Sequence, residues 1–369
     1  MNRRRMDLLR RVLAVPTAPF HEHRVAETVR SFAADAGLRF DTDGAGNVLL
    51  RLPAGSADRK DRPHWVFAAH MDHPGFSARV CRGRSVWAEF RGGVGLSYFR
   101  GASVCFFSGD EEARGIVASA RRNAATRCID CRIELAEPAR PGAGAFGMWD
   151  LPAVRVRGSR VAARACDDLV GVAAVLAALE EIAARGDGAK VTGLLTRAEE
   201  TGFVGALAAC ELGTIPDGAL VVALEASAAQ AQASLGGGAV IRVGDKARTF
   251  TPELTALVQA VANDLSERKR GFRAVSALMP GGTCEATAYA ARGHMAGGLC
   301  VPLGNYHNQG RKGRILPERI DLGDFDSMVT LLTALAADGR RPSDARDALN
   351  RRLDERLEKG RAYLGPMKK

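Results

Sequence analysis

Four short apolar runs, each leading to a residue of a kind that binds metal ions, constrain the fold of this chain more than any other feature. The runs cover residues 66–69, 191–196, 219–224 and 298–302, and they lead to His70, Glu199 with Glu200, Glu225, and His307. Short β-branched runs bounded by turn residues are typical of buried strands. In open α/β sheets, ligands bind outside the carboxyl ends of the strands. The sequence therefore predicts a metal site at one edge of a sheet.

Helix-like and strand-like patterns alternate along most of the chain. Apolar residues recur at helical spacing on both sides of residues 16–19 and again over residues 169–184. Over residues 75–157 the pattern changes to short alternating runs separated by glycine turns, which is typical of a compact β module. After Pro342 the chain is charged and helix-prone to Glu358.

These patterns predict an α/β fold in which a small β-barrel-like domain interrupts a three-layer α/β/α sheet. We expect a discontinuous catalytic domain of residues 1–74 and 158–340 and an inserted β-rich domain of residues 75–157. Residues 341–369 form a charged helical tail in this prediction. A chain of 369 residues, 46% of them hydrophobic, can bury a core large enough for two domains.

The formal net charge of +10 permits nucleic-acid binding, but no other feature of the sequence supports it. The arginines are spread along the chain, and no aromatic residues alternate with them. No run approaches the roughly 20 apolar residues that a membrane helix needs, and residues 1–7 lack the apolar centre of a signal peptide. We expect a cytoplasmic protein that binds neither nucleic acid nor membranes.

The eight cysteines lie scattered in apolar contexts, which is typical of reduced, buried thiols. Cys128 and Cys131 form the one close pair. A zinc site usually needs a second pair, so the sequence favours packing roles for both.

The candidate ligands supply the donor set of a dinuclear hydrolytic site. Such a site needs a carboxylate shared by two divalent ions, further carboxylate and imidazole ligands, and one carboxylate free to move protons. In the segment His70-Met71-Asp72, residues i and i+2 face the same way, so Asp72 can orient the imidazole while His70 faces a metal. Glu199 and Glu200 point in different directions, so one can bind metal while the other acts as general base.

Each motif also has a common structural explanation. A His-x-Asp pair can be a local hydrogen bond, and adjacent glutamates are usually surface charges on a helix. Asp167 and Asp168, which precede an apolar run, can cap a helix. The joint order of the motifs, four at strand ends and one at a helix entrance, favours the metal site.

In order and spacing these motifs resemble those of the dinuclear metallo-aminopeptidases that form tetrahedral (TET-type) particles. These are the glutamyl and deblocking aminopeptidases, once often mislabelled as cellulases. The resembling segments are residues 43–47, 69–76, 164–171, 199–202, 225, 280–283, 301–302 and 306–307. The resemblance implies a metallopeptidase sheet with an inserted β-rich domain that helps to build an oligomer around a chamber for peptides.

Carried over residue by residue, the resemblance implies two ions that share Asp167. The ligands would be His70, Asp167 and Glu225 for one ion, and Asp167, Glu200 and His307 for the other. Glu199 would be the general base, and Asp72 would orient His70. We expect two divalent ions, zinc foremost, with cobalt or manganese as alternatives.

The function implied is the removal of N-terminal residues from peptide substrates by a metal-bound hydroxide. The resemblance also implies a homo-oligomer of up to a dodecamer. The chain departs from the family at three positions: Glu225 replaces an aspartate, Leu169 replaces an arginine, and Cys284 with Glu285 stands where an aspartate follows Gly-Gly-Thr. These departures leave the substrate preference open.

Other functions fit parts of the pattern. A carboxypeptidase or an amino-acid deacylase would need a guanidinium for the carboxylate of its substrate, and Arg164 and Arg273 are the candidates. A non-catalytic scaffold would carry a broken ligand set, whereas every ligand position here holds a competent residue.

Overall fold

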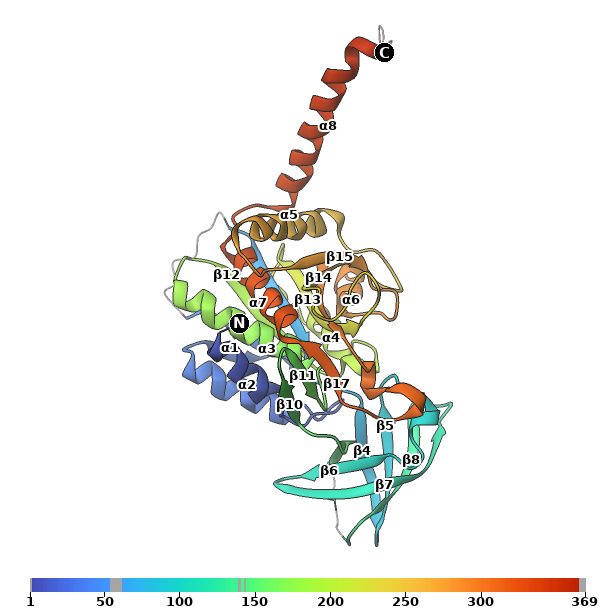
Figure 1. Cartoon of the computed structure of the whole chain (residues 1–369). Helices are drawn as coiled ribbons and strands as arrows, with labels where there is room; N and C mark the ends of the chain where they lie inside the picture. Colours follow the sequence, from blue (N-terminus) through green and yellow to red (C-terminus); the bar gives the residue numbers. More distant parts are fainter. Residues whose placement is uncertain (1, 54–61, 139–140, 143, 365–369) are drawn as a thin grey trace.

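An eight-stranded sheet forms the centre of the larger part of the molecule (Figure 1). The computed structural model describes residues 2–53, 62–138, 141–142 and 144–364. In spatial order the strands are β1 (Arg39–Thr42), β2 (Val48–Arg51), β12 (Lys190–Thr196), β3 (His64–His70), β13 (Leu220–Ala228), β16 (Met295–Leu303), β14 (Ala239–Gly244) and β15 (Ala274–Leu278). The four central strands β12, β3, β13 and β16 are parallel. Their carboxyl ends therefore meet at one edge of the sheet.

Helices cover both faces of this sheet. One face packs against α1 (Arg3–Leu13), α2 (His23–Asp35), α3 (Leu169–Arg185), α5 (Pro252–Arg268) and α7 (Leu322–Ala337), and the other against α4 (Val204–Glu211) and α6 (Glu285–Ala291). Side chains of β3 alternate between the two cores, with Trp65 and Phe67 in the first and Val66 and Ala68 in the second. The predicted three-layer α/β/α fold is confirmed.

Helix α3 fixes the position of the Asp167-Asp168 pair. Its first turn is capped by the Asp168 carboxylate, which accepts a hydrogen bond from the Gly171 amide at 3.1 Å. The helix ends at Gly186, whose φ of +60° lies in the left-handed region that favours glycine. Most side chains between these caps are buried, so α3 holds Asp167 rigidly at the edge of the sheet.

A closed six-stranded barrel follows β3 in the sequence, and it lies at the lower end of the molecule in Figure 1. Its strands are, in spatial order, β4 (Gly75–Arg82), β5 (Ser85–Arg91), β8 (Ile129–Leu135), β7 (Glu111–Arg122), β6 (Ser103–Ser108) and β9 (Phe146–Trp149), with one 3-10 turn, η1 (Leu96–Tyr98). Its core is aromatic: Phe76, Phe90, Phe99 and Trp149 contact one another with ring centroids between 4.8 and 6.3 Å apart. The predicted small β-barrel is confirmed.

A three-stranded antiparallel sheet lies between the barrel and the large sheet in Figure 1. It consists of β10 (Val154–Arg157), β11 (Arg160–Ala163) and β17 (Glu318–Asp321). Ala163, shortly before Asp167 in the sequence, pairs with Glu318, shortly after His307. This pairing brings the two segments that carry these candidate ligands side by side.

The last helix, α8 (Pro342–Leu364), projects from the molecule at the end opposite the barrel (Figure 1). It extends beyond Glu358, where the sequence pattern predicted its end, and contacts α5 near its base. Several of its leucines are exposed. Among the described residues, no helix is long and apolar enough to cross a membrane.

Candidate metal centre

The structure brings the five predicted metal ligands together at the carboxyl edge of the parallel strands. His70 ends β3, and Glu200 lies in a 3-10 turn, η2 (Glu199–Thr201), after β12. His307 lies in a second turn, η3 (Tyr306–Asn308), after β16. Ligand atoms of His70, Asp167 and Glu225 lie within 4.8 Å of one another, as do those of Asp167, Glu200 and His307.

Asp167 lies between the two imidazoles. Its Oδ1 is 3.6 Å from Nε2 of His70, and its Oδ2 is 3.5 Å from Nε2 of His307. Glu225 Oε2 is 4.0 Å from the His70 nitrogen, and Glu200 Oε1 is 3.1 Å from the His307 nitrogen. Each carboxylate oxygen of Asp167 thus faces a separate group of donors.

The donor set fits divalent cations. Asp167 Oδ1, Glu200 Oε1 and Glu225 Oε1 are buried and find no hydrogen-bond donor among the described residues. A buried carboxylate oxygen without a donor is costly, and a cation removes that cost. Carboxylate oxygens and imidazole nitrogens in groups of three are also the ligands that catalytic zinc sites use.

Burial and neighbouring charges together set the pKa values of the carboxylates in this cluster. Burial opposes the charged form of Asp167, but the adjacent imidazoles of His307 and His70 outweigh it and hold the pKa of Asp167 below its usual range. Burial and the nearby Asp167 charge raise the pKa of Glu225 to about 8. Burial also raises the pKa of Glu199 well above its ordinary value, with Glu225 and Glu200 adding to the effect and His70 opposing it.

Glu225 lies inside a strand and not after one, which corrects the expectation that its strand ends at Leu224. β13 continues to Ala228, paired with β16, while its pairing with β3 ends at Ala223. Beyond Ala223, no strand among the described residues pairs with β13 on the β3 side. Glu225 therefore lies within a strand and is still at the edge of the sheet where His70 lies. Periodicity could not predict this, because the end of a strand depends on its neighbours.

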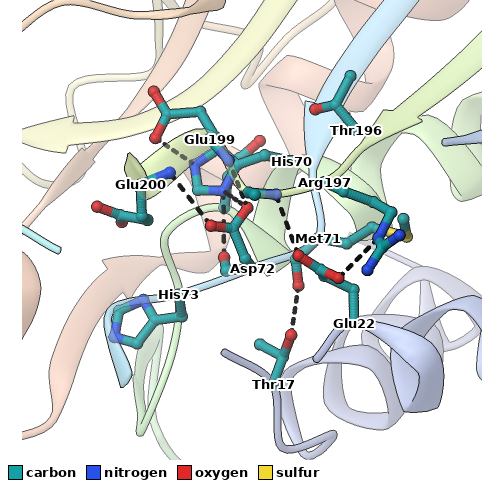
Figure 2. Close-up of polar contacts among 12 residues, drawn as sticks. Thr17, Glu22, His70, Met71, Asp72, His73, Thr196, Arg197, Glu199 and Glu200 are labelled. Atoms are coloured by element: carbon teal, nitrogen blue, oxygen red, sulfur yellow. Dashed lines mark hydrogen bonds and ion pairs between the residues drawn. The ribbon is translucent and has the colours of Figure 1, made fainter. Parts of the chain in front are cut away.

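Asp72 joins His70 to the glutamate pair, as Figure 2 shows. Its Oδ1 is 3.4 Å from Nδ1 of His70, and its backbone oxygen is 3.1 Å from the same nitrogen. Its carboxylate also accepts hydrogen bonds from the backbone amides of Glu199 at 2.9 Å and Glu200 at 3.1 Å. The sequence predicted the contact with His70 but not the two backbone bonds, which span more than 120 residues of chain.

A second buried carboxylate supports the segment before Glu199. Glu22 accepts hydrogen bonds from the Ala198 amide at 3.0 Å and from Nε of Arg197 at 2.8 Å (Figure 2). Ala198 has a φ of +51°, in the left-handed region. The Asp167-Asp168 peptide bond on the facing side of the site is cis.

Glu318 is a buried residue that the sequence did not single out. Its Oε2 accepts hydrogen bonds from the amides of Cys166 at 2.7 Å and Asp167 at 3.0 Å, and its Oε1 accepts one from the His307 amide at 2.8 Å. One carboxylate therefore holds the backbone of two candidate ligands. Nothing in the sequence distinguishes Glu318 from other glutamates, because its partners come from distant segments.

His73 and Asn308 extend the same network. Nδ1 of His73 is 2.6 Å from the backbone oxygen of Asp167, and its Nε2 is 3.0 Å from Oδ1 of Asn308. Asn308 in turn donates to the backbone oxygen of Arg164 at 2.9 Å. These contacts attach the η3 turn to the segment that carries Asp167.

A cavity of about 290 Å³ opens beside the cluster, bordered by Glu225, Tyr306 and the loop of residues 279–283. Arg242 of β14 also lines it, whereas Arg164 and Arg273, the guanidinium groups that the sequence suggested, do not. Arg164 is buried elsewhere, 5.0 Å from the ring centroid of Phe107. Sequence analysis missed Arg242, since an arginine within a strand is ordinarily a surface residue.

Two of the three departures from the family, Leu169 and the pair Cys284 with Glu285, lie at the starts of helices. Leu169 is buried in the first turn of α3. Cys284 and Glu285 are buried at the start of α6, where burial raises the pKa of Glu285 to about 7.

Comparison with known proteins decides the family. The profile of the M42 glutamyl aminopeptidase family matches residues 46–331. The chain belongs to this family. The family that the sequence motifs predicted is therefore confirmed. The expectation that the chain is a peptidase is confirmed with it.

Solved structures similar to this M42 chain share its fold. The TET1 peptidase of Pyrococcus horikoshii, described as able to assemble into a tetrahedron or a large octahedral shell, has a TM-score of 0.70 at 19% identity, over 90% of this chain and 99% of its own. A TET aminopeptidase from the marine sediment archaeon Thaumarchaeota archaeon SCGC AB-539-E09 has a TM-score of 0.73 at 18% identity, over 90% and 96% of the two chains. A structure described as an endoglucanase from Thermotoga maritima has a TM-score of 0.65 at 17% identity, over 89% and 96%.

One curated relative, the cytosol non-specific dipeptidase of Escherichia coli, is 32% identical over 66 residues. That stretch spans 18% of this M42 chain and 13% of the dipeptidase.

The cysteine pair lies in the barrel of the M42 chain, away from the ligand cluster. Cys131 is buried and Cys128 half-buried, and no group of metal-binding side chains among the described residues includes either. Burial raises the pKa of the Cys131 thiol to about 12, which keeps it protonated at neutral pH.

Proposed function

We propose that this protein is a dinuclear metal-dependent aminopeptidase that releases residues from the N-termini of peptides. The observation that carries the proposal is the position of Asp167, with one oxygen toward His70 and the other toward His307. Glu225 and Glu200 complete a group of three donors on each side. A shared carboxylate between two such groups is the arrangement that a two-ion hydrolase requires.

In this proposal His70, Asp167 and Glu225 hold one ion, and Asp167, Glu200 and His307 hold the other. Bound divalent ions, zinc foremost with cobalt or manganese as alternatives, would polarise the peptide carbonyl and make water a stronger nucleophile. Glu225 is one methylene longer than the aspartate usual in the family. From its position inside β13 its carboxylate lies 4.0 Å from Nε2 of His70.

Glu199 is the proposed general base. Its Oε2 lies 3.9 Å from Nε2 of His70, and its side chain is almost buried at the edge of the cluster. Burial raises its pKa well above the ordinary value, which makes this carboxylate a stronger base than an exposed glutamate. Glu199 would accept a proton from the attacking water on a carboxylate oxygen and deliver it to the amine of the departing peptide.

Asp72 would position this base. Its carboxylate accepts the amide protons of both Glu199 and Glu200 and lies beside Nδ1 of His70. One side chain thus fixes the spacing between a ligand of the first ion, a ligand of the second and the base.

We propose further that residues 75–157 form a separate inserted domain, with residues 1–74 and 158–340 forming the catalytic domain. The similarity to TET peptidases that assemble into tetrahedral or octahedral shells supports a homo-oligomer of up to a dodecamer. The barrel, which projects from the catalytic part, offers a surface for such contacts.

The test uses protein reconstituted with zinc, cobalt or manganese and short peptides that are free, acetylated at the N-terminus or amidated at the C-terminus. An aminopeptidase cleaves the free and amidated peptides and not the acetylated ones. Cleavage that requires a free C-terminus would instead indicate a carboxypeptidase, and release of acetate would indicate a deacylase. The same peptides are tested with Glu199→Gln, which should not cleave them, and with Glu211→Gln, at an exposed glutamate, as the control.

A further inference from the structure

The barrel contacts the candidate metal centre through one backbone oxygen. Nδ1 of His307 lies 3.1 Å from the backbone oxygen of Gly93, in the barrel segment between β5 and η1. The other ring nitrogen, Nε2, lies 3.5 Å from Asp167 and 3.1 Å from Glu200. Because a carbonyl oxygen only accepts hydrogen bonds, Nδ1 carries the hydrogen of this contact. Nε2 can then offer its lone pair on the side where Asp167 and Glu200 lie.

The backbone conformation of His307 depends on its surroundings. Its φ of +52° lies in the left-handed region, as does the φ of +60° at Asn308, and neither residue is a glycine. Such conformations persist where neighbouring groups hold them. Glu318 holds the His307 amide from the catalytic part of the molecule, whereas the Gly93 oxygen holds the imidazole from the barrel.

Gln309 fixes the barrel segment that carries the Gly93 oxygen. Its Nε2 donates to that oxygen at 3.2 Å, and its Oε1 accepts a hydrogen bond from the Gly95 amide at 3.1 Å. One side-chain amide thus uses its donor and its acceptor on two residues of the barrel. Gln309 directly follows the η3 turn that contains His307, so the two side chains share the Gly93 oxygen as acceptor.

Glycines allow the barrel segment to approach the imidazole closely. A Cβ atom at Gly93 would lie 3.3 Å from Nδ1 of His307, so even one methyl group would press against the ring. At Gly92, φ is +119° and a Cβ atom would lie 2.5 Å from Cβ of Pro74. Gly93 is exposed and has no side chain of its own to anchor it. Gln309 supplies an anchor from the catalytic part.

Other contacts join the same two segments without reaching the imidazole. The hydroxyl of Tyr98, in η1, donates to the backbone oxygen of Gly310 at 3.1 Å. Ile315 packs against the hydrophobic core of the barrel. The segment between β16 and β17, orange in Figure 1, therefore lies against the barrel at several points. Of these contacts, the one from Gln309 shares its acceptor with His307.

We propose that Gln309 is a positioning residue for His307: it holds the Gly93 oxygen in the place from which that oxygen orients the imidazole. The proposal rests on the proposed dinuclear function and makes the barrel a structural part of the metal centre. Loss of the Gln309 amide should leave all ligands present but free the Gly93 oxygen to move away from Nδ1. The affinity for the ion bound by His307 should then fall, while the affinity for the other ion should not.

The experiment titrates zinc into the metal-free protein by calorimetry and fits two binding constants. His307→Ala shows which constant belongs to the ion that His307 binds. The test variant is Gln309→Met, which keeps the length of the side chain and removes both hydrogen bonds. Tyr98→Phe is the matched control, because it removes a hydrogen bond between the same two segments but none to Gly93. Gly93→Ala is a second test variant, since its Cβ atom would press on the imidazole.

We expect Gln309→Met to weaken the constant of the His307 ion by about threefold or more, as loss of a hydrogen bond gives, and to leave the other constant within about twofold. Gly93→Ala should weaken the same constant, and Tyr98→Phe should match wild type at both. In a peptide assay, Gln309→Met should lose activity at limiting zinc and regain it to within about twofold of wild type at excess zinc, because the ligands themselves remain. A purely structural role would instead lower Tm and both constants alike.

A change of less than about threefold in the His307 constant of Gln309→Met, or an equal fall in Tyr98→Phe, would overturn the proposal. If that result comes with wild type that binds two ions and cleaves peptides, the aminopeptidase function stands and only this inference fails. If wild type binds two ions but cleaves no peptide, the aminopeptidase function fails and the titration still decides the role of Gln309. Wild type that binds no ion through His307 would refute both. If Gln309→Met does not fold, Gly93→Ala decides, and an unchanged constant there overturns the proposal.

Discussion

Changing Glu318 to glutamine should weaken both the fold and the binding of metal, although Glu318 touches neither ion in the proposed site. Its carboxylate accepts three backbone hydrogen bonds, from Cys166, Asp167 and His307, and is fully buried. A carboxylate has two accepting oxygens, whereas an amide has one oxygen and one NH₂ group. In Glu318→Gln, at least one backbone N–H must therefore face a donor.

The magnitude follows from these contacts. A hydrogen bond to a charged group contributes about 1.5–3 kcal/mol, and a buried N–H left without an acceptor costs about 1–3 kcal/mol. The glutamine variant no longer buries a charge, which offsets part of this cost. We therefore expect the free energy of unfolding to fall by about 2–5 kcal/mol. With an unfolding entropy of about 0.8 kcal/mol per kelvin for a chain of this length, Tm should fall by roughly 3–6 °C.

Metal binding should weaken at both ions, because in the proposed site Asp167 is a ligand of each and His307 is a ligand of one. Loss of a group that orients ligands typically costs about 10–100-fold in metal affinity. The assay combines thermal unfolding of the metal-free protein with calorimetric titration of zinc, and Glu267→Gln, at an exposed glutamate, is the control. A variant with unchanged Tm and with zinc affinity within twofold of wild type would refute this account of Glu318.

Glu199→Gln should abolish turnover and leave two ions bound per chain, and loss of the ions measured by metal analysis would make Glu199 a ligand instead. Asp167→Asn should remove more metal than His307→Ala, because Asp167 contributes to both groups of donors; equal metal content in the two variants would contradict a shared carboxylate. Burial raises the pKa of Asp324 to about 6, so the folded protein holds this proton more tightly than the unfolded chain. The stability of wild type relative to Asp324→Asn should therefore be greatest below about pH 4 and fall by up to about 3 kcal/mol as the pH rises through about 6 to neutrality. Chemical unfolding across this range measures it, and a difference between the two proteins that does not change with pH would show that Asp324 keeps its ordinary pKa.

The motifs of the sequence were sufficient to predict the layered fold, the barrel and the M42 family. Strands and helices have different hydrophobic periods, and these periods can be recognised in residues 64–70 and in α3 without any tertiary information. The candidate ligands could also be identified, because His70 is the last residue of β3 and His307 lies in the turn that follows β16.

The supporting residues could not be predicted in the same way. Asp72 was expected to orient His70, yet its closest hydrogen bonds are to the amides of Glu199 and Glu200. Glu22 carries no motif, although its carboxylate holds the segment before Glu199. Each of these contacts joins residues more than 120 positions apart, and local patterns carry no information on such pairs.

The sequence by itself determined which residues end the central strands and which chemistry they can supply, because hydrophobic period and residue type are local properties. Only the tertiary structure decided that Glu225 lies within a strand, that Glu318 holds both Asp167 and His307, and that Arg242 borders the cavity. The physical reason is that the register of neighbouring strands and the packing of distant segments set these positions. A buried charge is identified by what surrounds it, and its surroundings exist only after folding.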